Sequence, residues 1–135
     1  MATVIVNGGQ AIITNLVSGI GGTVPKFIGW GTGTQTTATV SDTSLGPTTI
    51  EKLVDLSTSA GTDHTTGTVT RTTTTVTNDT MTVTGTRTAT GAGTVTVQGL
   101  FDAASGGNLF VKADSAGTAL SIGDSIAYTW NIKWS

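Results

Sequence analysis

The sequence predicts an all-β protein: an antiparallel β-sandwich, jelly-roll-like, with about eight or nine strands. Thr, Val and Ile supply 53 of the 135 residues, and their β-branched side chains suit the pleated surface of a strand. Short segments rich in these residues alternate with Gly-rich turns, which is typical of antiparallel sheets. Strong helix formers are scarce, with 1 Glu and 4 Lys, so we expect no helix between the strands.

Glycines divide the N-terminal third into short segments. We expect residues 1–15 to form an N-terminal strand, or an arm that reaches onto a neighbouring molecule, and residues 16–135 to form a single sandwich domain. Apolar and β-branched residues predict strands at 24–30 and 37–40. The segment 50–56 fits either a helical face or a strand, and we favour an edge strand.

Threonine dominates the middle of the chain and predicts a hairpin between residues 72 and 90. Asn78 and Asp79 tolerate positive φ and are expected to form its two-residue turn, which places Val76 opposite Met81. Alternation along the second strand gathers threonines on one side: Thr82, Thr84, Thr86, Thr88 and Thr90.

Alternation is clearest in the last third of the chain. Val95, Val97 and Phe101 are expected to line one side of a strand, and residues 105–108 are expected to form a turn. In the C-terminal strand the large residues occupy every second position, so we expect this strand at the centre of a sheet, against the main core. Those residues are Ile126, Tyr128, Trp130, Ile132 and Trp134.

The chain carries little charge: 6 Lys and Arg against 8 Asp and Glu, a net charge of −2. Binding to a phosphate backbone needs a basic surface, so nucleic acid is not an expected partner. No apolar run approaches the ~20 residues that span a bilayer, and the N-terminus lacks the features of a signal peptide. We therefore expect neither a membrane partner nor export. A neutral surface favours association, so we expect other subunits to cover it.

Residue types that perform catalysis or bind metals are scarce. The chain has no Cys and a single His, His64, which together with Asp63 cannot supply the three or four ligands of a zinc site, so we expect a polar loop tip there. No Gly-x-Ser-x-Gly elbow occurs. Residues 29–34 (GWGTGT) lack the Lys of a phosphate-binding loop and are expected to connect strands. We expect no enzymatic activity, no cofactor and no metal.

Tryptophans offer one further kind of site. Trp130 and Trp134 share the periodic face of the C-terminal strand and are expected in the core. The pattern does not place Trp30, which could stack on a sugar if it were exposed at a pocket, as in lectin-like jelly rolls.

Several short stretches follow one another between Lys26 and Ser135. They are residues 26–34 (KFIGWGTGT), 42–45 (DTSL), Glu51, 78–80 (NDT), 94–103 (TVTVQGLFDA), 105–109 (SGGNL) and 123–125 (GDS), before the alternating terminal strand. This arrangement resembles a family of small virion proteins of tailed phages: head cement or decoration proteins, and similarly patterned tail-associated proteins. Gln98 and Lys112 stand where the family pattern has an acidic residue and an Arg, which puts a family salt bridge in doubt. The resemblance implies a jelly-roll-like sandwich with a structural role and no catalysis.

Composition and resemblance together predict a capsid cement (decoration) protein on the outer surface of a phage head, made in the host cytoplasm. Its expected partners are the major capsid protein and itself, as a homo-dimer or homo-trimer. The alternative is a tail-fibre or baseplate-associated protein that binds host surface glycans, with Trp30 as the candidate contact. The residues expected at the protein–protein interface are Val4, Ile5, Val6, Ile12, Ile13, Thr82, Thr84, Thr86 and Thr88.

Overall fold

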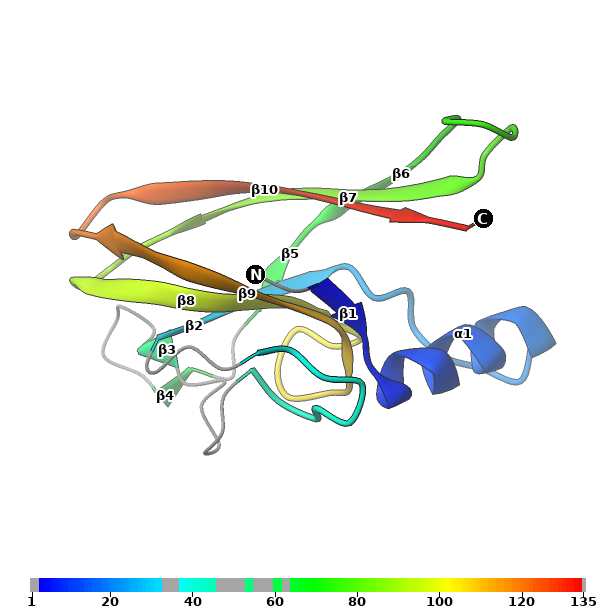
Figure 1. Cartoon of the computed structure of the whole chain (residues 1–135), viewed down its shortest axis with the longest axis horizontal. Coiled ribbons are helices and arrows are strands. Elements are labelled where there is room, and N and C mark those ends of the chain that lie inside the picture. Colours follow the sequence, from blue (N-terminus) through cyan, green and yellow to red (C-terminus); the bar gives the residue numbers. More distant parts are fainter. Residues whose placement is uncertain (1–2, 33–36, 46–52, 55–59, 62–63, 135) are drawn as a thin grey trace.

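Two antiparallel sheets pack face to face in the structure (Figure 1), a computed structural model that describes residues 3–32, 37–45, 53–54, 60–61 and 64–134. One sheet has the strand order β1-β9-β8-β2-β5, the other has the order β10-β7-β6, and β3 and β4 form a separate pair. The predicted all-β sandwich is confirmed. The elements are β1 (Thr3–Ile5), α1 (Asn7–Ser18), β2 (Phe27–Thr32), β3 (Leu53–Val54), β4 (Ala60–Gly61), β5 (Thr65–Thr66), β6 (Thr68–Thr72), β7 (Thr80–Thr88), β8 (Gly93–Phe101), β9 (Leu109–Leu120) and β10 (Ser125–Lys133).

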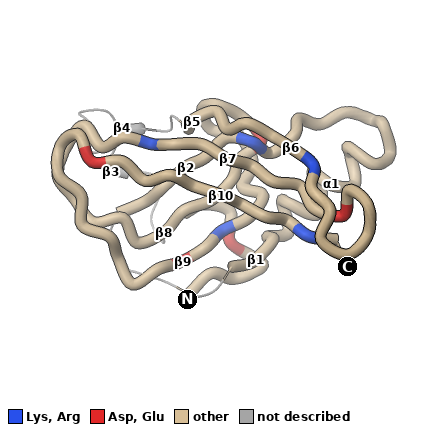
Figure 2. The backbone as a smooth tube through the Cα atoms, turned by 90° about the horizontal axis from the view of Figure 1, so that it is seen from above, with Lys and Arg blue, Asp and Glu red and all other residues tan. Residues whose placement is uncertain are grey.

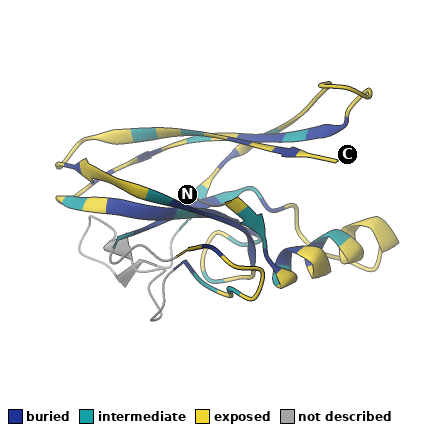
Figure 3. Ribbon diagram, viewed as in Figure 1, coloured by how far each residue is buried: buried dark blue, intermediate teal, exposed yellow. Residues whose placement is uncertain are grey.

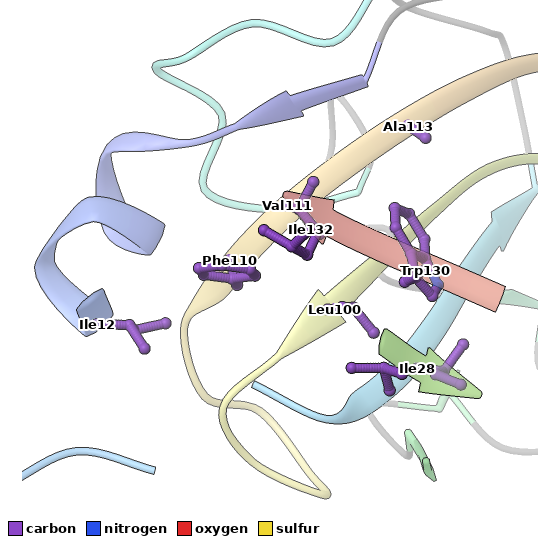
Figure 4. Packing of buried hydrophobic residues seen from close by; sticks show 9 residues of the cluster. Ile12, Ile28, Leu100, Phe110, Val111, Ala113, Trp130 and Ile132 are labelled. Carbon is purple, nitrogen blue, oxygen red and sulfur yellow. The ribbon is translucent and has the colours of Figure 1, made fainter. Parts of the chain in front are cut away.

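The main core lies between the two sheets (Figures 3 and 4). Ile28 of β2, Leu100 of β8 and Val111 of β9 belong to one sheet, and they pack with Val83 of β7 and Trp130 of β10 from the other. All five side chains are buried. Removing this much apolar surface from water is the main force that holds the sheets together.

The sheet that contains β9 is covered on its other face as well. Leu45, which comes from the segment 37–45, packs there against Val97, Phe101 and Leu109. The predicted strand at 37–40 is wrong, because these residues form no strand and belong to this covering segment. The predicted strand at 50–56 lies outside the described residues except for β3.

β2 includes residues that were expected to connect strands. Gly29 to Thr32 are part of the strand, whereas residues 33–34 of the predicted loop lie outside the described residues. At Gly29 a Cβ would lie 2.8 Å from Cε2 of Phe101 and 3.0 Å from Cδ2 of His64. The glycine here makes room for two rings rather than for a turn.

A change of register divides the residues of β8 between two clusters. Val95 packs with Trp30, Ala89 and Leu120, whereas Val97 belongs to the cluster on the opposite face. The register shifts between Val95 and Val97, and a one-residue shift turns side chains to the other face. The prediction that Val95 and Val97 share a face is therefore wrong.

The N-terminal segment contains a helix, so the expectation of no helix is wrong. Only β1 pairs as a strand, along β9, and residues 7–15 lie in α1. Gly8 and Gly9 allow the first turn to approach β9 closely, since a Cβ at Gly9 would overlap the Phe110 carbonyl. Ile12 then packs into the main core, and Gly19, with φ of 70°, ends the helix in the left-handed region.

The threonine-rich hairpin forms, but with a longer loop than predicted. β6 and β7 pair so that Arg71 lies opposite Met81, and Val76 is in the loop, 66% exposed. Asn78 has the expected positive φ, 60°. Asp79, however, organises residues 73–79: its carboxylate accepts hydrogen bonds from the backbone N–H groups of residues 74, 75 and 76 at 2.8–3.0 Å. These bonds favour a wide loop over a two-residue turn.

β10 is an edge strand, so the prediction that it lies at the centre of a sheet is wrong. Its alternation is confirmed as far as Ile132: Trp130 and Ile132 are buried, and Ile126 and Tyr128 are partly buried against the core. Trp134 follows the strand and is 45% exposed, which contradicts its expected place in the core.

Candidate interaction surfaces

The outer face of the β10-β7-β6 sheet carries a continuous array of threonines. Every second residue of a strand points away from the core, and the register aligns these residues across the sheet: Thr84 of β7 lies between Thr68 of β6 and Thr129 of β10. We call this surface the threonine face. Its members are Thr68, Thr70, Thr72, Thr80, Thr82, Thr84, Thr86, Thr88, Ser125, Ala127, Thr129, Asn131 and Lys133.

Hydrogen bonds join hydroxyl groups of the threonine face across the strands. Thr82 Oγ1 donates to Asn131 Oδ1 at 2.9 Å and lies 3.2 Å from Thr72 Oγ1. Thr88 Oγ1 and Ser125 Oγ are 2.7 Å apart. Such bonds restrict the side-chain rotamers, so part of the ordering cost of binding is met before a partner arrives.

The threonine face is almost uncharged, although Figure 2 marks several basic residues along the strands of this sheet. Lys133 is its single charged member and lies at the end of β10, where Nζ donates to Thr75 Oγ1 at 2.8 Å. Arg87 belongs to β7, but its side chain is buried in the sandwich. There Nη1 donates to the Ile28 carbonyl at 3.2 Å, and the guanidinium lies 5.1 Å from the Trp30 ring centroid.

Three of the four threonines predicted at the interface are exposed on this face: Thr84, Thr86 and Thr88. Thr82 is buried, because it lies between its hydrogen-bonded neighbours on β6 and β10. The contribution of β10 to this surface does not follow from the sequence, since the alternation of that strand identifies its core side but not which strand lies beside it.

The N-terminal residues predicted at the interface divide by their burial. Val6 and Ile12 are buried in the core of this chain, so this conformation offers almost none of their surface to another molecule. Val4, Ile5 and Ile13 are partly buried, and Ile5 and Ile13 pack against the main core.

A separate apolar hollow of about 420 Å³ lies between α1 and the C-terminus. It is lined by Ile13, Leu16, Val17 and Trp134. The exposed helix end continues this apolar character, since Val17 is 83% and Ile20 is 84% exposed. The sequence pattern does not indicate this hollow, because it predicts neither a helix at the N-terminus nor an exposed position for Trp134.

The other two ring-bearing candidates, Trp30 and His64, pack inside the molecule. Trp30 has no exposed surface, so it is not available as a sugar-stacking platform. His64 does not form a polar loop tip: its ring stacks on Phe101, with centroids 3.9 Å apart, and Nδ1 lies 2.8 Å from the Ala103 carbonyl oxygen. Within the described residues, no group of three or more His, Cys, Asp or Glu side chains could hold a metal ion.

Lys112 has an acidic partner, although its family salt bridge was in doubt. Its ammonium group lies 2.9 Å from Asp42 Oδ2, and Asp42 also accepts hydrogen bonds from the N–H and the hydroxyl of Thr39, both at 2.9 Å. Burial acts to raise the pKa of Asp42, but the bonds from Thr39 and Lys112 outweigh it and hold the pKa below its usual value. This pair fixes the segment 37–45 to the sheet.

Comparisons of this chain with family models, curated proteins and solved structures returned no match. Among the described residues, no helix has the length and apolar character needed to cross a membrane.

Proposed function

We propose that this protein is a structural virion protein, a capsid cement that binds the outer surface of a phage head. The observation that carries the proposal is the threonine face, a broad array of ordered hydroxyl groups with one charge at its end. Soluble proteins usually keep exposed surfaces charged to discourage association. A neutral and hydrogen-bonded surface therefore supports a role in which a partner covers it.

The proposed mechanism is mechanical. A copy that binds the assembled shell, but not dissociated coat subunits, stabilises the shell by mass action. The partner on the shell is the major capsid protein. Self-association into a homo-dimer or homo-trimer fits the two-fold and three-fold axes of a shell. One oligomer of the cement protein could then bridge neighbouring capsomers.

The glycan-binding alternative loses its main support. It depended on an exposed Trp30, and Trp30 is buried. Trp134 is exposed, but the residues that surround it in the hollow are aliphatic, whereas sugar sites combine an aromatic platform with placed polar groups. We therefore argue for the head rather than for the tail.

Replacing two threonines of the threonine face by lysine tests whether this surface binds the phage head. In the variant Thr84→Lys/Thr86→Lys, binding would require the removal of water from two charges, so we expect affinity for phage heads to fall about tenfold or more. The melting temperature should change little because both positions are exposed. Co-sedimentation with heads purified without the protein measures the affinity.

The matched control is Ile122→Lys, in the turn between β9 and β10, where Ile122 is 75% exposed. It should co-sediment like the unaltered protein. Retained binding of the double variant would show that the threonine face is not the contact. If bare heads released their DNA at the same temperature as decorated heads, the cement role itself would be wrong.

A further inference from the structure

The sandwich is closed along one side and open along the other. On the closed side the chain passes from one sheet to the other at Gly67, directly from β5 into β6. Gly67 is tightly enclosed: its N–H donates to the Lys26 carbonyl at 2.8 Å, and a Cβ would lie 2.6 Å from Cγ1 of Val83. On the open side β10 is the last strand of its sheet, and no described segment covers it.

The open edge of β10 presents a regular row of backbone groups. In an antiparallel ladder, alternate residues direct both N–H and C=O away from their neighbouring strand. The bonds Trp134 N–H to Asp79 O (2.9 Å) and Ala89 N–H to Asp124 O (2.7 Å) show that the even-numbered residues of β10 bond to β7. The outward groups therefore belong to Ser125, Ala127, Thr129, Asn131 and Lys133.

A groove of about 300 Å³ runs beside this edge. Its walls come from β10 and from the opposite sheet, and it is lined by Thr3, Gln98, Ala113, Tyr128, Thr129, Trp130 and Asn131. Figure 1 shows β9 and β1 in the layer below β10, and the view from above in Figure 2 shows both strands reaching past β10 on this side. The five-stranded sheet thus leaves a shelf beside the edge strand.

The part of β9 and β1 that extends past β10 restricts which molecules can pair with this edge. Neighbouring strands of a sheet lie ~4.8 Å apart, so an added strand would lie above β9 and β1. A second copy cannot add its own β10 there, because its lower sheet would have to occupy the space that β9 and β1 already fill. A single extended segment, unaccompanied by a second sheet, meets no such obstacle.

The chemistry of the groove is neutral. Between Ser125 and Ile132, β10 carries no charged residue, and neither Ala113 nor Gln98 offers a counter-charge to a bound segment. A charged side chain placed between the sheets would lose its hydration without gaining a partner. A suitable segment has small apolar side chains at every second position, directed towards Tyr128 and Trp130.

We propose that the open edge of β10 is a strand-acceptor site, which binds an extended, uncharged segment of another protein chain as an additional strand. The main-chain ladder supplies the binding energy, and the groove selects the alternate side chains. The site uses the outward backbone groups of β10 at the border of the threonine face, and it does not require that the partner be a coat protein.

The first test uses a blocked nine-residue peptide that alternates threonine and valine, in two forms. One form is N-methylated at its threonines and the other at its valines. Because the N–H groups of the two residue types point to opposite edges of the extended peptide, only one form can pair antiparallel with β10 while its valines face the groove. We expect one form to bind about tenfold or more tightly than the other.

Binding of the peptide is measured by NMR of the backbone amides of the purified protein. Addition of the tighter form should shift and protect the amides of Ser125, Ala127, Thr129, Asn131 and Lys133. Equal binding of the two forms, absence of binding, or shifts confined to other strands would overturn the proposal.

The second test is Thr129→Pro. Proline removes an N–H that points away from β7, and edge strands tolerate it, so the fold should persist while peptide affinity falls about tenfold or more. Thr129→Ala retains the N–H and should bind like the unaltered protein. If Thr129→Pro is folded by circular dichroism and binds equally well, the proposal is wrong. Failure of both tests with normal binding to heads would remove this site and leave the cement proposal standing.

Discussion

Asp79 is the residue on which the β6–β7 loop depends. Its carboxylate accepts bonds from the backbone of Val76, Thr74 and Thr75, which hold its pKa far below the usual 3.8. Because the folded-state pKa is lowered, the stabilisation is complete above pH ~4 and is lost as the pH falls through the folded-state value. The loop should therefore be among the parts of the molecule most sensitive to acid.

We predict that Asp79→Asn lowers the melting temperature at neutral pH, because an amide cannot replace both carboxylate oxygens as acceptors. The variant should also lose part of the decline in stability below pH ~4 that the unaltered protein shows. Thermal unfolding followed by circular dichroism across pH 2–7 measures both effects. Asp124→Asn is the control, since among the described residues the Asp124 carboxylate accepts one backbone bond, from Ser121 at 2.7 Å. Equal losses in the two variants would contradict this role of Asp79.

The ion pair between Lys112 and Asp42 gives a second prediction at this scale. The Lys112 side chain is 3% exposed and that of Asp42 is 24% exposed, so Asp42→Asn leaves a nearly buried ammonium group without its counter-charge. We expect a loss of about 1–3 kcal/mol in the free energy of unfolding.

Adding Lys112→Met to Asp42→Asn should recover much of this loss, because an apolar side chain then replaces the unpaired buried ammonium group. Urea denaturation of both single variants and the double variant forms a double-mutant cycle. Strictly additive losses would show that the two groups do not stabilise each other.

At the scale of elements, the crossing from β5 to β6 depends on the absence of a side chain at Gly67. In Gly67→Ala the new methyl group would meet the Lys26 carbonyl at 2.9 Å as well as Val83. We expect a loss of about 1–3 kcal/mol. Gly85→Ala is the matched control, because its closest neighbour is the terminal Cδ1 of Ile28 at 2.7 Å, which can rotate away. Urea denaturation should show the larger loss at Gly67, and the reverse order would contradict this account of the closed side.

Elements with strong alternation could be predicted from the sequence, and elements fixed by long-range contacts could not. The inward face of β10 follows from the spacing of Ile126, Tyr128, Trp130 and Ile132, yet the position of a strand within its sheet leaves no local pattern. α1 begins with Asn7 and two glycines, which locally indicate a turn. Close packing of those glycines on β9 outweighs their low helix propensity. The hairpin register likewise depends on hydrogen bonds that Asp79 makes across the loop.

For the whole molecule, the sequence indicated a neutral, threonine-rich surface but not its extent. Alternation in β7 identified Thr84, Thr86 and Thr88, whereas the contributions of β6 and β10 required the register of the sheet. The open edge could not be predicted either, because it depends on which strands lie at the margins of the two sheets. The molecule thus has two candidate interaction surfaces, the threonine face and the strand edge at its border.

Our proposal places the threonine face against the outside of a phage shell. A cryo-EM map of the virion tests it most directly, since the sandwich can be placed and oriented in such a density. We expect copies of the sandwich on the outer head surface, with the β10-β7-β6 sheet towards the capsomers. A virion whose head carries no such density, or which shows the sandwich at the tail tip, would contradict it.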